Sequence, residues 1–207
     1  MFVPEIYAFD DSAQIAECIR KYPLGILISS LPDQPLMASH LPFLLHTDGD
    51  KWQLRAHIAK ENPHSLVLID GADILVVFQG PNTYISSSWY SHPNVSTWNY
   101  QAVHCYGILK LQTDAQLWHS LQELTDLYEE EMQCPVRLKD LPKELLLDYF
   151  PLIAGFVIDI HRIDAANKMS QNRNEADKQN IVAELMKCPF PGAKEIGKEV
   201  EGIIVNG

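Results

Sequence analysis

Apolar residues in alternating or continuous runs dominate the first half of the chain and predict short β-strands. The segment Leu24–Ser30 is nearly all apolar, as in a strand with two buried faces, and Leu31–Pro35 (LPDQP) is predicted to be a turn. The segment Trp52–Ala59 follows an Asp-Gly pair typical of hairpins, so we expect it to pair antiparallel with Leu36–His46. Further strands are predicted at Ala72–Gly80, Pro81–Tyr90 and Asn99–Gln112.

Apolar residues at helical spacing predict helices elsewhere in the chain. Ile15 and Ile19 lie four residues apart in a short helix that follows Asp11 and Ser12. Thr113 and Gln116 have capping-box spacing ahead of a longer amphipathic helix. A further helix is predicted at Leu141–Ile153 and a surface helix at Asn174–Lys187. Between these two helices, Ala154–Asp164 is predicted to be a strand.

This order of elements predicts an α+β protein built on a small antiparallel β-barrel with flanking helices. Antiparallel strands of this number usually close into a barrel, because closure removes exposed sheet edges. We expect one domain over residues 1–187 and a tail, residues 188–207, whose structure the pattern leaves open. The tail has two prolines, and Gly197 interrupts its only helix-like run.

Composition and charge exclude several classes of protein. The 207 residues carry a formal net charge of −11, which disfavours tight binding of nucleic acid by the chain alone. The four cysteines are scattered, as expected of reduced thiols in a cytosolic protein. The N-terminus resembles no signal peptide and the apolar runs are too short to span a bilayer, so we expect a cytoplasmic protein without a membrane partner.

A cationic cluster lies at the end of the predicted strand Trp52–Ala59. Arg55 and His57 share one strand face, and Lys60 and Asn62 follow at a helix entry, where free N–H groups attract anions. Arginine and lysine together suit a phosphate group. The alternative is a solvated strand face in which Glu61 compensates one positive charge.

A second polar cluster follows the predicted strand Ala154–Asp164. It contains Lys168, Ser170, Gln171 and Arg173, all of which can form hydrogen bonds. The alternative interpretation is that these residues form a polar loop before the next helix.

A third cluster, Tyr84–Gly107, mixes aromatic rings with hydroxyl and amide groups. Trp98 and Asn99 lie within it, and such residues suit either a pocket for a flat heterocycle or a dimer interface. The sequence shows no nucleophile paired with a base and no histidine spacing typical of a metal site, so no catalytic residue and no metal is predicted.

Five segments in order resemble one known family, the FMN-binding negative transcriptional regulators of the PaiB type. They read ASHLPF, LRAHIAKENPH, VVFQGPNTYISSSWY, TWNYQAVHCYG and KMSQNRNEAD, and the resemblance covers roughly residues 1 to 186. It implies the FMN-binding split-barrel fold, related to pyridoxamine-phosphate oxidases, which are dimers that hold FMN at the subunit interface. In two places, Ser87 and Ser96, this chain has serine where the family often has proline.

The resemblance also assigns expected roles to residues and to the protein. Arg55 and Lys60 have the spacing of a phosphate-binding pair, and the segment Lys168–Arg173 corresponds to one that reaches the flavin. The leading hypothesis is a dimeric FMN-binding repressor, with DNA contact implied by the family and not by the charge. The alternatives are a flavin-dependent oxidoreductase and a flavin-binding module without chemistry, so whether the protein is an enzyme stays open.

Overall fold

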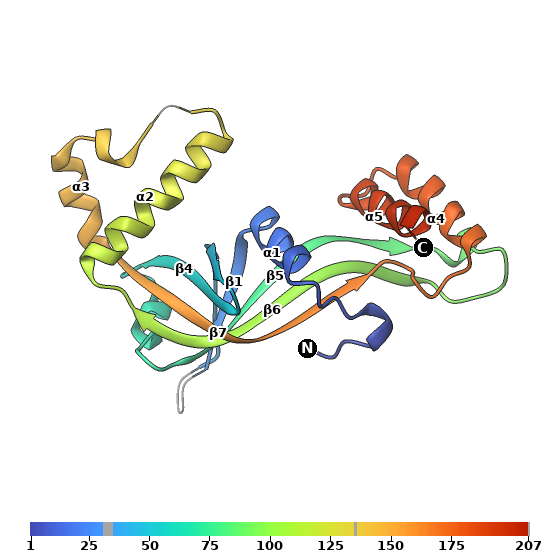
Figure 1. The fold of residues 1–207 in the computed structure, drawn as a ribbon, viewed down its shortest axis with the longest axis horizontal. Coiled ribbons are helices and arrows are strands. Elements are labelled where there is room, and N and C mark those ends of the chain that lie inside the picture. The colour runs from blue at the N-terminus through green and yellow to red at the C-terminus, as the bar shows by residue number, and fades with distance from the viewer. Residues whose placement is uncertain (31–34, 135, 207) are drawn as a thin grey trace. The chain divides into compact units, whose positions relative to one another are not determined.

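The computed structural model describes residues 1–30, 35–134 and 136–206 (Figure 1). Apart from Pro35, the predicted turn at Leu31–Pro35 therefore lies outside the described residues. The strands are β1 (Leu24–Ser29), β2 (Met37–Pro42), β3 (Leu44–Asp48), β4 (Lys51–Ala59), β5 (Asp73–Ile85), β6 (Thr97–Leu111) and β7 (Ile153–Lys168). The α-helices are α1 (Ser12–Lys21), α2 (Asp114–Glu131), α3 (Lys143–Tyr149), α4 (Glu175–Lys187) and α5 (Ala193–Asn206). Short 3₁₀ helices are η1 (Glu5–Tyr7), η2 (Pro63–Val67), η3 (Ser87–Trp89), η4 (Leu138–Asp140) and η5 (Phe150–Leu152).

The strands form one sheet in the order β2-β1-β5-β6-β7-β4-β3. Strand β1 pairs antiparallel with β2 and β5, and β4 pairs antiparallel with β3 and β7. The two outermost strands, β2 and β3, are separated in the chain by Phe43 alone, so the sheet must curl until its ends meet. The predicted α+β class with an antiparallel barrel and flanking helices is confirmed.

The chain divides into two compact units. The barrel unit comprises Ile19–Phe78 and Cys105–Ile163, and the terminal unit comprises Met1–Cys18, Gln79–His104 and Asp164–Gly207. Strands β5, β6 and β7 contribute residues to both units.

Three phenylalanines form the centre of the barrel unit. Phe43 is 2% exposed, and its ring lies 5.7 Å from that of Phe78 and 6.5 Å from that of Phe156, in edge-to-face geometry. A Cβ on Gly25 would lie 2.8 Å from the Phe78 ring, so glycine is required for β1 to approach this cluster. Because these residues come from β1, β5, β7 and the β2–β3 junction, the core holds the curled sheet together.

The predicted hairpin between the third and fourth strands is confirmed. Asp48 pairs with Lys51 across a turn in which Gly49 has a φ of +56°. This left-handed conformation carries no steric cost for glycine.

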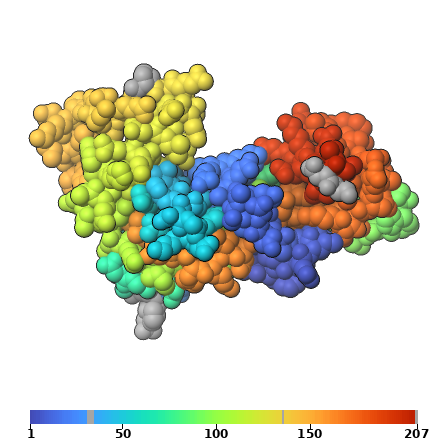
Figure 2. Space-filling model, viewed as in Figure 1, coloured from blue at the N-terminus to red at the C-terminus, as the bar shows by residue number. Residues whose placement is uncertain are grey.

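Helices α4 and α5 pack against each other in the terminal unit, and their orange and red surfaces lie in contact in Figure 2. Ile181 and Leu185 of α4, and Ile196 and Val200 of α5, are all fully buried. The predicted surface helix therefore has one buried face. The tail contains helix α5, which begins after Gly192, a residue with a φ of +79°.

Three strand predictions differ from the structure in extent. Leu36–His46 was expected as one strand, but the structure divides it at Phe43 into β2 and β3. Ala72–Gly80 and Pro81–Tyr90 were expected as separate strands, but β5 runs continuously through Pro81 and η3 follows it. Strand β7 extends to Lys168, beyond the predicted end at Asp164, and its Ala166 forms a β-bridge with Ala8. In the described part of the chain, no helix is long and apolar enough to cross a membrane.

Candidate functional site

Arg55 of the barrel unit is bound by a carboxylate. Arg55 and His57 lie on the face of β4 opposite its buried side chains, and the Arg55 Nη1 donates to Glu123 Oε2 of α2 at 2.9 Å. The imidazoles of His46 and His119 each lie 3.4 Å from an oxygen of the same carboxylate. An anion that binds Arg55 must therefore compete with Glu123 or share the guanidinium with it.

Two imidazoles near Arg55, those of His57 and His46, have lowered pKa values. Burial lowers the pKa of His57, and the pKa of His46 is lowered by burial and then by the nearby Arg55 charge, against the opposing effect of Glu123. At neutral pH the positive charge of this strand face thus comes from Arg55.

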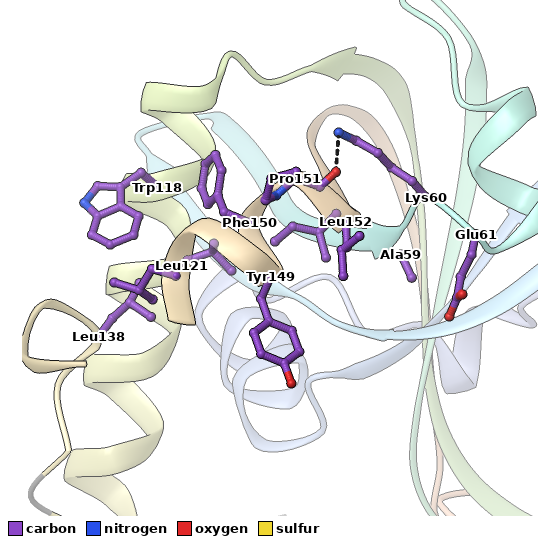
Figure 3. Close-up of a pocket in the computed structure, with 12 residues that line it drawn as sticks. Ala59, Lys60, Glu61, Trp118, Leu121, Leu138, Tyr149, Phe150, Pro151 and Leu152 are labelled. Carbon is purple, nitrogen blue, oxygen red and sulfur yellow. Dashed lines mark hydrogen bonds between the residues drawn. The ribbon is translucent and has the colours of Figure 1, made fainter. Parts of the chain in front are cut away.

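Lys60 and Asn62 have other partners. The Lys60 ammonium donates to the Pro151 carbonyl oxygen at 2.8 Å, as Figure 3 shows. Asn62 is the N-cap of η2, where its Oδ1 accepts from the backbone N–H of His64 at 3.0 Å. The predicted helix entry exists, but as a five-residue 3₁₀ helix. Within the barrel unit, Arg55 and His57 share one face, whereas Lys60 and Asn62 bind separate backbone groups.

His64, the last residue of the segment LRAHIAKENPH that contains the cationic cluster, is a buried polar residue. It is 1% exposed, and its two ring nitrogens lie 2.8 Å from the hydroxyls of Ser29 and Ser39. Burial lowers its pKa, so the ring is neutral and joins β1, β2 and η2. Only its position after Asn62 and Pro63, at the start of a helical turn, hinted at a structural role.

In the terminal unit, Asn99 of β6 meets Ser170, which follows β7. Asn99 is fully buried and its Nδ2 donates to the Ser170 hydroxyl at 2.9 Å. Ser170 has a φ of +60°, an uncommon conformation for a non-glycine residue, and Gln171 Oε1 accepts from the Met169 N–H at 2.7 Å. These bonds fix the turn that carries Lys168 and Arg173.

Lys168 and Arg173 place two positive charges beside each other. The Lys168 ammonium donates to the Thr97 hydroxyl at 2.6 Å, and the Arg173 guanidinium lies over the Tyr90 ring at 4.3 Å. Burial, and then the charge of Arg173, lowers the pKa of Lys168. Three buried polar atoms of this cluster have no hydrogen-bond partner among the described residues: Arg173 Nε, Tyr90 OH and Asn167 Oδ1. The cluster therefore retains unused hydrogen-bonding capacity next to a cationic pair.

A buried acid, Asp177, supports this turn and was not singled out from the sequence. Its carboxylate accepts from the Ser91 N–H at 2.7 Å and from Asn174 Nδ2 at 3.1 Å. The Ser91 N–H is the largest cause of the lowered pKa of Asp177, and His92 and Arg173 add to it. The available signal was the capping spacing between Asn174 and Asp177 at the start of α4.

Trp98 belongs to an exposed aromatic group. It is 42% exposed, and its ring lies 6.1 Å from those of Tyr84 and Phe190. Trp89 and Tyr90, which belong to the same predicted cluster Tyr84–Gly107, instead pack on the core of α4 and α5. The aromatic surface of the terminal unit is therefore built by Tyr84, Trp98 and Phe190.

The sequence-predicted residues thus form two groups, each within one unit. Arg55, His57, Lys60 and Asn62 belong to the barrel unit, and Trp98, Asn99, Lys168, Ser170, Gln171 and Arg173 belong to the terminal unit. Across the described residues, no three acidic, histidine or cysteine side chains are grouped to hold a metal ion.

Comparison with known families gives a match over most of the chain. The family model described as "Putative FMN-binding domain" matches residues 1–162. The chain belongs to this FMN-binding domain family. The matched range includes Arg55 and Asn99 and ends before Lys168.

Relatives of this FMN-binding domain protein share nearly its whole length. It is 35% identical over 201 residues to "Protease synthase and sporulation protein PAI 2" of Bacillus subtilis, and the alignment covers 97% of each chain. It is 27% identical over 224 residues to an uncharacterized protein of Emericella nidulans, covering 88% of this chain and 89% of the relative. The resemblance to the PaiB-type family is confirmed.

Solved structures confirm the split-barrel fold of this FMN-binding domain protein. A FAD and heme binding protein from Mycobacterium smegmatis superposes with a TM-score of 0.62 at 16% identity, over 90% of this chain and 82% of that one. The flavocytochrome Anf3 from Azotobacter vinelandii superposes with a TM-score of 0.56 at 16% identity, over 90% of this chain and 78% of that one. At these identities the similarity concerns the fold alone.

Proposed function

We propose that this protein binds FMN and acts as a PaiB-type regulator that responds to its flavin. The observation that carries the proposal is the cationic pair Lys168 and Arg173, with the buried Arg173 Nε lacking an acceptor among the described residues. Membership of the FMN-binding domain family supports the choice of FMN, and the 35% identity to the PAI 2 protein supports the PaiB type.

The side chains of the terminal unit fit the chemistry of a flavin. A flavin ring offers carbonyl and nitrogen acceptors, which match the donors of Lys168, Gln171 and Arg173. Asn99 and Ser170 hold the turn that presents these donors, and the exposed ring of Trp98 can stack on a flat heterocycle. When bound, FMN supplies redox chemistry, while the protein supplies binding and positive charge.

We propose Arg55 as the principal ligand of the FMN phosphate, with His57, Lys60 and Asn62 as its neighbours in the group. The guanidinium is available only in competition with Glu123, which lies 2.9 Å from it. A phosphate carries more charge than one carboxylate and accepts bidentate hydrogen bonds, so it can displace that partner.

Titrations of FMN and of riboflavin test both groups. We expect Arg55→Ala to weaken FMN binding by about 1.5–3 kcal/mol and to leave riboflavin, which lacks the phosphate, unchanged. We expect Arg173→Gln to weaken both ligands, because Arg173 is assigned to the ring. Arg137→Ala is the matched control, since it also breaks an arginine–carboxylate pair with α2, at 3.1 Å from Asp126. Unchanged FMN affinity in both Arg55→Ala and Arg173→Gln would remove the proposed site.

Regulation is proposed to act through the flavin and through other proteins more than through direct DNA contact. The net charge of −11 repels phosphates, and the compact cationic groups are those assigned to FMN. The purified protein is expected to bind duplex DNA with a Kd no lower than about micromolar at physiological salt. A nanomolar complex with a defined promoter would contradict this assignment.

A further inference from the structure

A cavity of about 550 Å³ lies in the barrel unit, and Figure 3 shows its lining residues. Ala59, which shares a face of β4 with Arg55 and His57, is one of them. Helices α2 and α3 and the adjoining ends of β4 and β7 form it. Its volume falls in the range of about 300–1,000 Å³ that is usual for small-molecule sites. Its principal lining residues are Trp118, Leu121, Leu138, Leu146, Phe150 and Leu152.

Aromatic and leucine side chains form the walls of this α2–α3 cavity. The rings of Trp118 and Phe150 lie 6.1 Å apart with planes tilted by 57°. Helix α3 contributes no buried residue, and at the rim Tyr149 is 64% exposed and Leu152 is 57% exposed. Apolar surface of this kind gains from being covered by an apolar ligand.

Lys60 provides one cationic group at the rim of the cavity. Its ammonium donates to the Pro151 carbonyl at 2.8 Å and forms no ion pair with any residue that the structure describes. An ammonium has three donor hydrogens, so two remain for a ligand. Glu61 also lines the cavity, but Figure 3 shows its carboxylate pointing away from the Lys60 ammonium. The charge at this rim therefore favours an anionic head group.

We propose that the α2–α3 cavity binds a small aromatic carboxylic acid. Its carboxylate pairs with the Lys60 ammonium, and its ring lies against Trp118 and Phe150. This site goes beyond the proposed FMN binding, because its walls come from α2, α3 and η5 and its occupation requires no flavin. It shares Lys60 with the group proposed to bind the FMN phosphate, so the two ligands are expected to compete for that ammonium.

Calorimetric titration of the full-length protein as purified tests the site with two matched probes. 1-Naphthaleneacetate and its neutral amide have nearly the same size and differ in charge. We expect the acid to bind with a Kd of about 0.1 mM, within the range open to a ligand of about fourteen non-hydrogen atoms. We expect the amide to bind about tenfold more weakly, because it cannot form the ion pair with Lys60.

Two variants with matched controls locate the binding. Lys60→Met should weaken the acid about tenfold and leave the amide unchanged, whereas Lys51→Met, at the other end of β4, should change neither. Leu146→Trp should abolish binding of both probes by filling the cavity. Leu147→Trp is its control, because Leu147 is 63% exposed on the same helix and does not line the cavity. Circular dichroism spectra verify that each variant is folded.

Absence of binding at millimolar acid would overturn the proposal, as would binding that Leu146→Trp leaves intact. Equal affinity for acid and amide would overturn the assignment to an acid. The FMN titration is separate, so an effect of Lys60→Met on FMN bears only on the proposed function.

Discussion

His64 shows how a single residue acquires its role from partners that are distant in the chain. Ser29 and Ser39 come from two paired strands, and both hydroxyls lie 2.8 Å from the ring of His64. The bonds satisfy both ring nitrogens, so the buried neutral imidazole has no unpaired polar atom. Burial also lowers the pKa values of His46, His57 and His104.

These lowered pKa values predict a loss of stability in mild acid. Between pH 6.5, the ordinary histidine pKa, and the lower folded-state pKa, the unfolded chain binds protons that the folded chain does not. The free energy of unfolding should therefore be unaffected by these histidines above pH 6.5 and fall below it. The slope is at most about 1.4 kcal/mol per pH unit for each histidine.

Urea unfolding measured between pH 5 and pH 8 tests this dependence. His64→Gln, which can keep hydrogen bonds to serine but does not titrate, should flatten the curve below pH 6.5. His40→Gln, at an exposed position of β2, is the control and should leave its shape unchanged. A curve that stays flat in the wild type down to pH 5 would contradict the lowered pKa values, because it would mean that the folded and unfolded chains bind the same number of protons.

Among the elements, helix α5 has a weak sequence signal but an important structural role. Its buried residues Ile196 and Val200 complete the core formed by Ile181 and Leu185 of α4. A Cβ on Gly197 would lie 3.4 Å from the Leu185 Cβ, which is ordinary van der Waals contact, so the packing does not require this glycine and its effect is to weaken the helix. The helix is therefore held by packing more than by intrinsic propensity.

Truncation of Ile196 should reveal this packing. Ile196 is fully buried, so Ile196→Ala should lower the free energy of unfolding by about 2–5 kcal/mol, through lost burial and the cavity left behind. Val205→Ala is the control on the same helix, because Val205 is 77% exposed, and should change stability by less than about 0.5 kcal/mol. Denaturant unfolding followed by circular dichroism distinguishes the two, and similar effects in both variants would contradict the role of α5.

For the whole molecule, the exposed aromatic group of Tyr84, Trp98 and Phe190 favours assembly. Two of these rings, Tyr84 and Phe190, are 48% and 49% exposed, and clustered exposed aromatics are typical of interfaces. We propose a homodimer in which this surface is buried.

Sedimentation velocity at micromolar concentration should show the dimer. Phe190→Glu should shift the equilibrium toward monomer, because it places a charge in the interface. Val205→Glu adds the same charge at an exposed position of α5 outside the aromatic group and should leave the dimer intact. A wild-type monomer, or a dimer that resists Phe190→Glu, would exclude this surface.

The sequence alone determined the elements whose signals are local. The spacing of Ile15 and Ile19 located α1, the capping box at Thr113 located the start of α2, and the Asp-Gly pair located the β3–β4 turn. Each of these signals lies within a few residues, where backbone geometry directly relates side-chain position to sequence spacing. The family motifs in turn identified the split barrel and its flavin class.

Only the tertiary structure decided which partner each polar side chain has. Arg55 binds Glu123 at 68 residues' separation, Lys60 binds Pro151 at 91, and Asn99 meets Ser170 at 71. The sequence grouped Arg55 with Lys60 because they are neighbours in the chain. Their actual partners depend on how α2 and η5 pack beside β4, and no local spacing encodes that packing.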